Sequence, residues 1–331
     1  MRNTVLIPTY RRPQDLARCL KALQQQTKSV DQAIVVVRDT DTETQQFLHQ
    51  FPPHLLPLQI VTVTQPGVVA ALNAGLAQVQ GDILSITDDD AAPHPDWLAK
   101  INTHFSVNYT IGGVGGRDWV YQGDKLENGS RPIVGKLQWW GRVIGNHHLG
   151  VGAPREVDVL KGVNMSFRTQ AIGKLRFDDR MQGTGAQVHF EMSFALTLKR
   201  AGWKMIYDPS IAVDHYPAQR FDEDQRHNFN DTALINLVHN ETLILLEHLS
   251  PLRQIVFLSW SILVGTRESL GICQWLRLFP QQKEIASKKL RASLQGRWLG
   301  YQKYRKIGNH HLVGVRSQES GVKNLYPRKS A

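Results

Sequence analysis

The segment GDILSITDDD, residues 81–90, joins a short apolar run to three adjacent aspartates. Three earlier runs have a similar apolar, β-branched character, at residues 4–8, 32–37 and 58–64. Helical spacing of apolar residues separates these runs, at residues 16–23, 42–51 and 72–79. Short buried strands that alternate with helices are typical of βαβ units. We therefore expect an α/β fold with a mostly parallel central sheet and helices on both of its faces.

The carboxyl ends of these strands carry arginines and carboxylates, at residues 8–12, 38–41, 65–67 and 88–90. In such sheets, ligands bind outside the carboxyl ends of the strands. Asp88 and Asp90 alternate, so both can face one side of an extended segment and bind a hard cation such as Mg²⁺ or Mn²⁺. The pattern suits a phosphorylated ligand held through that cation. The alternative is an N-cap cluster ahead of a helix that begins near Asp96.

The middle of the chain, residues 105–215, has a mixed pattern. We expect further strands there, some of them antiparallel, at residues 111–117, 157–160, 164–168 and 204–207. Residues 191–200 have helical spacing, whereas residues 118–155 are rich in Gly, Trp and polar groups and predict long loops over a site. From residue 229 the pattern is helical, and Ser250-Pro251 is typical of a helix start.

The positive charge lies at one end of the chain. The net charge is +10, and residues 281–331 hold 12 Lys and Arg against two acids. Such a tail suits an anionic surface, either membrane or nucleic acid, or is only a solvated extension, and we expect disorder after Gly308. Residues 252–279 combine apolar bulk and tryptophans with flanking arginines. They predict a helix in the membrane interface or, alternatively, a packed helical hairpin or a dimer contact.

Composition excludes a collagen-like or wholly disordered chain, because 41% of the residues are hydrophobic and 21% are charged. Cys19 and Cys273 form no disulfide framework and no metal motif, which indicates a reducing compartment. The N-terminal apolar run is too short for a secretory signal, and residues 254–266 are too short to span a membrane. We expect a cytoplasmic protein that lies peripherally at the inner membrane face.

Several segments, in order, resemble the family 2 glycosyltransferases, which have the GT-A fold. They are residues 7–13 (IPTYRRP), 35–39 (VVVRD), 70–75 (AALNAG), 81–82 (GD) and 87–90 (TDDD). The second half continues the resemblance at residues 162–168 (GVNMSFR), at Glu191 followed by Gly202, and at residues 208–215 (DPSIAVDH). The match covers residues 1–216, about two-thirds of the chain, and several motifs in the right order are far more specific than any one alone.

The resemblance implies roles for individual residues. It assigns donor binding to Pro8, Thr9, Arg11, Asp39, Asn73, Asp88 and Asp89. Asp88 and Asp90 fall on the family's metal-binding DxD motif, and His215 falls where some members add a contact to the metal or diphosphate. Glu191 falls at the catalytic base, where the family usually has Glu-Asp and this sequence has Phe190-Glu191.

The resemblance also implies an organisation and a function. It implies that residues 1–216 form the GT-A domain. For the rest of the chain, the residues themselves predict a helical part at 217–280, either membrane-interfacial or packed as described above, and a partly disordered basic tail at 281–331. Within the domain, residues 1–104 bind the nucleotide-sugar and residues 105–216 carry the acceptor and catalytic half. The expected activity is metal-dependent, inverting transfer from a nucleotide-sugar, with UDP-sugars first, using Mg²⁺ or Mn²⁺.

The expected acceptor is a glycan or lipid-linked hydroxyl, in polysaccharide or glycolipid synthesis. An anionic membrane surface is a further expected partner, and nucleic acid is not. One alternative of the same fold is a sugar-nucleotide nucleotidyltransferase. The other is a non-catalytic protein that docks on anionic membrane or nucleic acid through its basic tail.

Overall fold

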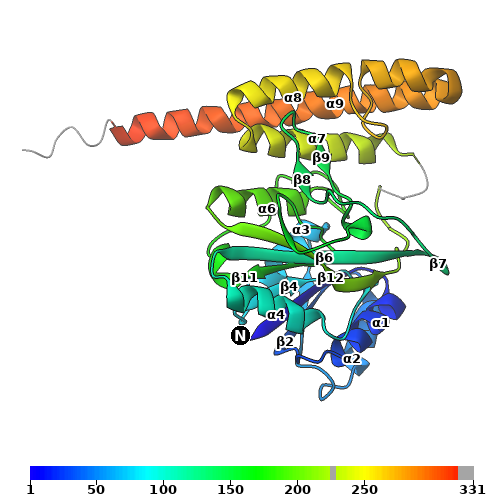
Figure 1. Cartoon of the computed structure of the whole chain (residues 1–331), viewed down its shortest axis with the longest axis vertical. Helices are drawn as coiled ribbons and strands as arrows, with labels where there is room; N and C mark the ends of the chain where they lie inside the picture. The colour runs from blue at the N-terminus through cyan, green and yellow to red at the C-terminus, as the bar shows by residue number, and fades with distance from the viewer. Residues whose placement is uncertain (224–228, 320–331) are drawn as a thin grey trace, which may run out of the picture.

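The computed structural model describes residues 1–223 and 229–319, and its first half alternates strands and helices as expected (Figure 1). The elements are β1 (Asn3–Thr9), α1 (Pro13–Gln24), β2 (Gln32–Arg38), α2 (Thr42–Gln50), β3 (Leu58–Val63), α3 (Val68–Leu76) and β4 (Ile83–Ile86). Local sequence starts the helices. Pro13 lies in the first turn of α1, and the Asp41 carboxylate caps α2 by accepting a hydrogen bond from the amide of Thr44.

The second half is mixed, again as expected. Its elements are β5 (Ala91–Pro93), α4 (Trp97–Val107), β6 (Ile111–Gln122), β7 (Lys125–Leu126), β8 (Lys136–Leu137), β9 (Val143–Ile144), the 3₁₀ turn η1 (His147–Leu149), β10 (Arg155–Val157), β11 (Met165–Arg168), α5 (Thr169–Ile172), α6 (Phe190–Arg200) and β12 (Lys204–His215). The strand expected at 157–160 is wrong beyond Val157. There the amides of Asp158 and Val159 both donate to the carbonyl of Gly135, which ends the ladder.

One sheet runs through this domain, with strand order β10-β12-β6-β11-β4-β1-β2-β3. β3, β2, β1 and β4 are parallel, whereas β11 runs antiparallel to both β4 and β6. β12 is parallel to β6 and also pairs with β5, in a register that puts His215 opposite Ala91. Because β5 directly follows the aspartate triplet, this register brings the end of β12 to the carboxyl ends of β1 and β4.

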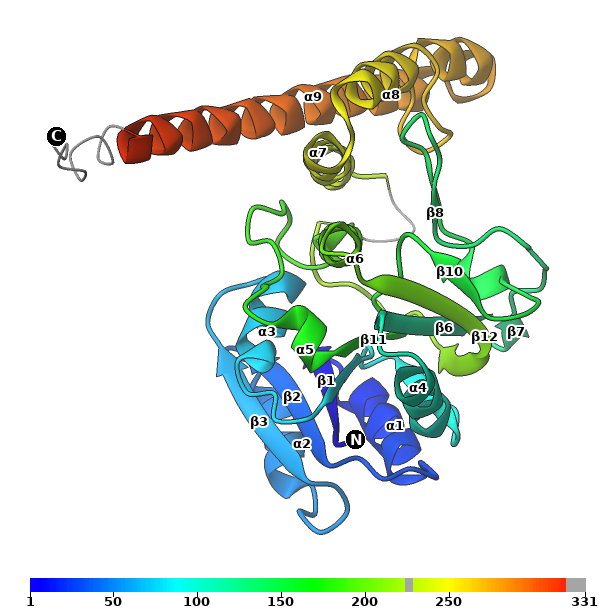
Figure 2. The same cartoon turned by 60° about the vertical axis from the view of Figure 1, so that its left-hand side comes forward.

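Both faces of the sheet are covered (Figure 2). Alternate residues of β1 enter different cores: Leu6 packs with α3 and α6, whereas Val5 and Ile7 pack with α1 and α4. All three side chains are 0% exposed, which is typical of a parallel strand with helices on both sides. Burial of this apolar surface is the dominant favourable contribution to folding of the domain.

Three C-terminal helices form a separate layer: α7 (Asp231–His248), α8 (Pro251–Leu263) and α9 (Ile272–Glu319). In both views α8 and α9 are outermost, and α7 lies between them and the sheet domain (Figures 1 and 2). The β8–β9 hairpin extends toward α8, where the Arg253 guanidinium donates to the carbonyl of Trp139 at 2.9 Å. Residues 118–155 are therefore not simply long loops.

The prediction of a separate basic tail from residue 281 is wrong for the residues that the structure describes. Helix α9 crosses residue 280, with a kink at Lys283, and it continues past Gly308 to Glu319. Gly296 and Gly300 lie so close to α7 that a Cβ atom at either position would clash with its backbone carbonyls. Arg297, 4% exposed, donates to Thr242 of α7 at 3.0 Å. A lone glycine costs a helix only about 1 kcal/mol, which tertiary packing can outweigh.

Two further findings concern the helical layer. Phe257, an apolar residue of the segment expected at the membrane interface, is instead 0% exposed and packs against Gly141. Among residues 1–223 and 229–319, the structure has no helix that is both long enough and apolar enough to cross a membrane. Residues 320–331, the end of the expected tail, lie outside the described residues.

Candidate active site

A cavity of about 490 Å³ opens at the carboxyl ends of β1, β2 and β4. Of the predicted site residues, those that line it are Pro8, Thr9, Asp88, Asp89, Asp90 and Glu191. Its other walls include the end of β3 and the start of α3, residues 162–163 before β11, residues 184–190 up to the start of α6, and residues 220–222 after β12. No residue of 118–155 lines it, so the loops predicted over a site lie elsewhere.

The outer two aspartates of the triplet converge with His215. One ligand atom each from Asp88, Asp90 and His215 lies within 4.8 Å of the others. The Nε2 atom of His215 is 3.4 Å from Oδ1 of Asp90, and Asp90 is 1% exposed. Two carboxylates and an imidazole suit Mn²⁺ or Mg²⁺, and buried carboxylates require a compensating charge. These residues therefore fit a divalent cation.

The pKa values of Asp88, Asp90 and His215 are shifted by burial and by the charges of their neighbours. Burial, together with neighbouring Asp90, raises the pKa of Asp88 above its ordinary value. Burial also acts to raise the pKa of Asp90, but its contacts with His215 and the Ala218 amide outweigh burial and hold it below the ordinary value. For His215, burial lowers the pKa, yet the flanking carboxylates Asp118 and Asp90 raise it overall.

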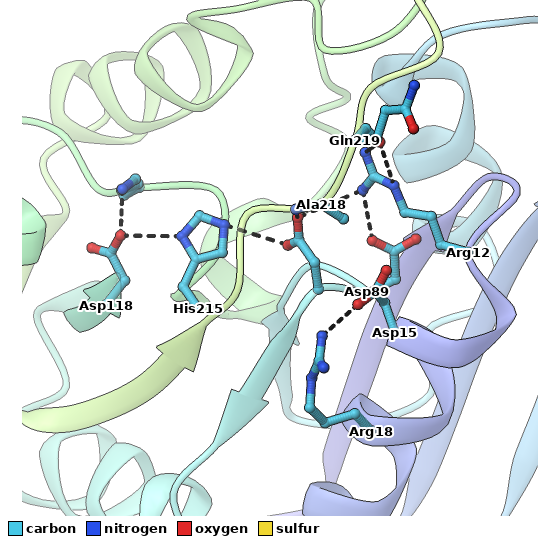
Figure 3. Close-up of polar contacts among 10 residues, drawn as sticks. Arg12, Asp15, Arg18, Asp89, Asp118, His215, Ala218 and Gln219 are labelled. Carbon is cyan, nitrogen blue, oxygen red and sulfur yellow. Dashed lines mark hydrogen bonds and ion pairs between the residues drawn. The ribbon is translucent and has the colours of Figure 1, made fainter. Parts of the chain in front are cut away.

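The middle aspartate, Asp89, is not one of the three converging ligands. Its Oδ2 accepts a hydrogen bond from the Thr9 hydroxyl at 2.8 Å. Its Oδ1 accepts one from the Arg12 guanidinium at 2.9 Å (Figure 3). Burial raises the pKa of Asp89 to about 7, against the opposing effect of Arg12. Both predicted donor-binding groups, Thr9 and Asp89, are thus already hydrogen-bonded to each other.

Arg12 is a site residue that the sequence interpretation missed. Its guanidinium also lies 3.7 Å from Asp90 and donates to the carbonyl of Gln219 at 2.7 Å, so it ties the end of β1 to the segment after β12 (Figure 3). The Arg11-Arg12 pair was visible in the sequence, but the resemblance favoured Arg11. The structure instead leaves the Arg11 side chain exposed, with its amide donating to Asp41.

Two further predicted donor-binding residues lie outside the cavity lining. Asp39 is exposed just beyond the end of β2, at the rim. The amide side chain of Asn73 exchanges hydrogen bonds with the backbone of Phe177, at 2.9 and 2.8 Å, and lines a neighbouring cavity of about 470 Å³. The main cavity does not include either side chain.

Glu191 lies in the first turn of α6 and lines the same cavity as the aspartates. Burial raises its pKa above the ordinary value for glutamate. A half-buried carboxylate of raised pKa, facing a cavity, can accept a proton from a hydroxyl group bound there. The first-turn position is also the one that a helix dipole favours for a carboxylate, so both influences act on this side chain.

Aromatic side chains border the cavity beside the β1 and β2 ends. Tyr10 and Phe221 make an edge-to-face contact, with ring centroids 6.2 Å apart. The Arg38 guanidinium lies over Tyr10, 5.1 Å from its ring centroid. All three residues line the cavity, so it offers two aromatic rings and the Arg38 guanidinium in addition to the aspartates.

Comparison with known proteins agrees with this arrangement. Residues 4–175 match the family described as glycosyl transferase family 2. The glycosyltransferase AglE of Haloferax volcanii is 34% identical over 100 residues, which are 29% of this chain and 33% of that protein. The match therefore spans only about a third of the length of this relative.

Two solved structures share the fold. The mannosyltransferase PcManGT from Pyrobaculum calidifontis, in complex with GDP-Man and Mn²⁺, superposes with a TM-score of 0.57 at 17% identity, over 92% of this chain and 86% of that one. TarS 1–349 of S. aureus, in complex with UDP-GlcNAc, also gives 0.57, at 13% identity and 92% coverage of both chains. With the family model matching more than half of its length, the chain belongs to glycosyl transferase family 2.

Proposed function

We propose that this protein transfers a sugar from a nucleotide-sugar to a hydroxyl acceptor, with inversion at the anomeric carbon and with a divalent cation. The observation that carries the proposal is the convergence of His215 with Asp88 and Asp90, because these two aspartates line the same cavity as Glu191. Membership of the family supports glycosyl transfer as the reaction class.

In this proposal Asp88, Asp90 and His215 hold the cation. When bound, a cation there neutralises the diphosphate that leaves with the nucleotide. The hydrogen bond between Arg12 and Asp89 holds the middle carboxylate of the triplet in place at the cavity wall. The nucleoside lies toward the β1 and β2 ends, against Tyr10.

Glu191 acts as the general base. Inverting transfer needs one group that takes the proton of the acceptor hydroxyl while its oxygen attacks the anomeric carbon from the face opposite the leaving diphosphate. Burial keeps Glu191 basic enough for this task, because a raised pKa strengthens the carboxylate as a proton acceptor. A carboxylate at this position also disfavours the nucleotidyltransferase alternative, since nucleotidyl transfer needs no base here.

The donor and acceptor are proposed by class. UDP-sugars come first among donors, and the acceptor is a glycan or lipid-linked hydroxyl. Two solved structures of the same fold hold GDP-Man with Mn²⁺ and UDP-GlcNAc, respectively, which supports a nucleotide-sugar donor without choosing its base.

An anionic membrane is the proposed surface partner, through the outer helices α8 and α9. Exposed apolar residues on these helices include Leu252, Ile255, Leu263, Leu276, Phe279 and Trp298. Exposed basic residues accompany them, among them Arg267, Arg277, Lys283, Lys288 and Arg291. Apolar groups beside basic ones suit an anionic lipid surface, whereas a second copy of the chain would bring like charges together. This face, not a separable tail, is the proposed contact.

A hydrolysis screen tests the proposed activity. UDP-, GDP- and dTDP-sugars are each incubated with the full chain and Mn²⁺ or Mg²⁺, and release of nucleoside diphosphate is measured. We expect slow, cation-dependent hydrolysis of one donor class, absent in Asp90→Ala. No turnover by a folded protein, with binding to anionic vesicles retained, would instead favour the non-catalytic docking protein.

A further inference from the structure

The imidazole of His215 lies between two carboxylates from different segments, Asp90 in the turn before β5 and Asp118 in β6. Its Nε2 faces Asp90 at 3.4 Å, and its Nδ1 faces Oδ2 of Asp118 at 3.5 Å (Figure 3). Asp118 belongs to β6, where it pairs with Val213, two residues before His215. Side chains two apart on a strand share one face of the sheet, so the β6–β12 pairing itself sets Asp118 beside the ring.

Asp118 does not reach the ligand cavity. It is 0% exposed and is absent from the cavity lining. Its Oδ2 also contacts the ammonium group of Lys161, which balances the buried negative charge. Asp118 therefore cannot touch a donor or an acceptor, and it contacts the proposed cation ligands through His215.

A histidine that binds a cation through Nε2 must keep that nitrogen free of a proton. The proton then stays on Nδ1, and a carboxylate next to Nδ1 favours that tautomer and fixes the ring orientation. Such outer partners typically change metal affinity by about 10- to 100-fold. The structure has this arrangement: Lys161 contacts Asp118, Asp118 faces Nδ1 of His215, and Nε2 of His215 faces Asp90.

We infer that Asp118, held by Lys161, is a positioning residue that keeps the His215 proton on Nδ1 and leaves Nε2 for the cation. This inference rests on the proposed function, because it assumes that Asp88, Asp90 and His215 form a cation site. It assigns a role to a side chain that no motif in the sequence marks.

The chain offers a matched control in a second histidine–aspartate pair. His104 Nε2 lies 2.7 Å from Oδ2 of Asp208, and Asp208 is 7% exposed on β12, the strand that also carries His215. Neither residue lines the cavity. Asp208→Asn thus makes the same chemical change, in a comparable pair, away from the candidate cation site.

Manganese binding to the purified full chain, without any nucleotide, tests the inference. Free Mn²⁺ is followed by electron paramagnetic resonance for the parent and for Asp118→Asn, Asp208→Asn, His215→Ala and the Asp118→Asn/His215→Ala double variant. We expect Asp118→Asn to weaken Mn²⁺ binding about 10- to 100-fold and Asp208→Asn to leave it unchanged. In the His215→Ala background, Asp118→Asn should add nothing further.

The outcomes separate the possible failures. Equal Mn²⁺ affinity in the parent and Asp118→Asn overturns the inference, as does an equal loss in both backgrounds, which would mean a general structural role. A parent protein that binds no Mn²⁺ overturns the proposed cation site itself. If Asp118→Asn does not fold, nitrogen-15 NMR of the parent's histidines with Mg²⁺ decides: the inference requires the Nδ1–H tautomer at His215, and an Nε2–H tautomer contradicts it.

Discussion

The Arg12 guanidinium lies 2.9 Å from Oδ1 of Asp89, in a pair whose side chains are only 18% and 2% exposed. Close by, Arg18 pairs with Asp15 on the surface of α1, with side chains 40% and 27% exposed (Figure 3). The two pairs join the same chemical groups in different dielectric surroundings. Their difference in burial decides how much each contributes to stability.

Arg12→Ala should lower the free energy of unfolding by about 3 kcal/mol, because it leaves a buried carboxylate without its cation. Arg18→Ala should lower it by less than about 1 kcal/mol, since an exposed pair is screened by solvent. Urea unfolding of both variants at neutral pH checks this. Equal losses would show that burial of Asp89 does not govern the contribution of Arg12.

Asp90→Ala should abolish cation-dependent nucleotide binding while the protein stays folded. Asp90 supplies one of the three converging ligand atoms, and its loss leaves too few to hold a cation. Calorimetric titration of UDP and GDP in the presence of Mn²⁺ measures the effect. Asp96→Ala, at the start of α4 with its side chain 49% exposed, is the control. Unchanged nucleotide affinity in Asp90→Ala would exclude it as a cation ligand.

Glu191→Gln should retain donor affinity and lower turnover at least about 100-fold, because glutamine keeps the size of the side chain but cannot accept a proton. In the parent enzyme, turnover should fall with decreasing pH as Glu191 protonates, and this decline should begin at a higher pH than for an ordinary glutamate. Pre-steady-state and steady-state rates across pH test both points. Near-normal turnover in the variant would mean that a group other than Glu191 is the base.

His147 should make the protein less stable in mild acid. It is 5% exposed, and burial lowers its pKa to about 4, below the ordinary value of 6.5. Between these pH values the unfolded chain binds the proton more readily, so stability is lost as pH falls from about 6.5 to 4, by up to about 3 kcal/mol.

Thermal or urea unfolding from pH 7 to 4 measures that loss. His147→Gln should show a shallower decline with falling pH than the parent, whatever its stability at pH 7. His148→Gln, next in the chain and only half-buried, is the control and should follow the parent. Parallel curves for the parent and His147→Gln would contradict a buried, neutral histidine at this position.

Binding to anionic vesicles should depend on the outer face of α8 and α9. Ile255→Glu should weaken flotation with such vesicles, because the side chain is 65% exposed and apolar. Val107→Glu is the control, because it changes an apolar residue that is 81% exposed but lies on α4, and it should not weaken flotation. Arg277→Gln and Arg291→Gln should each weaken binding about fivefold, since each basic group near the surface contributes about 1 kcal/mol.

Salt and a charge control complete that test. Binding of the parent should decrease as salt rises, because exposed charges are screened over about 8 Å at physiological ionic strength. Lys174→Gln, exposed on the sheet domain, should bind as the parent does. Equal binding of all variants at every salt concentration would exclude this face as the lipid contact. Deletion of residues 281–331 is unsuitable, because it removes the packing partner of α7.

Much of the fold and part of the site could be predicted from local sequence. The strands at 4–8 and 32–37 are short, continuous, β-branched apolar runs, and the helix at 191–200 has apolar residues at helical spacing. The triplet ending β4 also marks the edge where ligands bind, because parallel strands align their carboxyl ends. The sequence alone therefore predicts Asp88 and Asp90 as candidate cation ligands, and the family resemblance adds Glu191 as the candidate base.

The sequence by itself determined the order of strands and helices up to residue 90 and the acidic edge of the sheet, because these depend on neighbours a few residues apart. Only the tertiary structure decided that Arg12 rather than Arg11 enters the site, that Asp118 stands behind His215, and that the basic tail packs on α7. Each of these depends on strand register and helix packing between segments distant in the chain. Such contacts produce no periodic pattern in the sequence. A single arginine or aspartate is the same letter whether its side chain lies in solvent or against a buried partner.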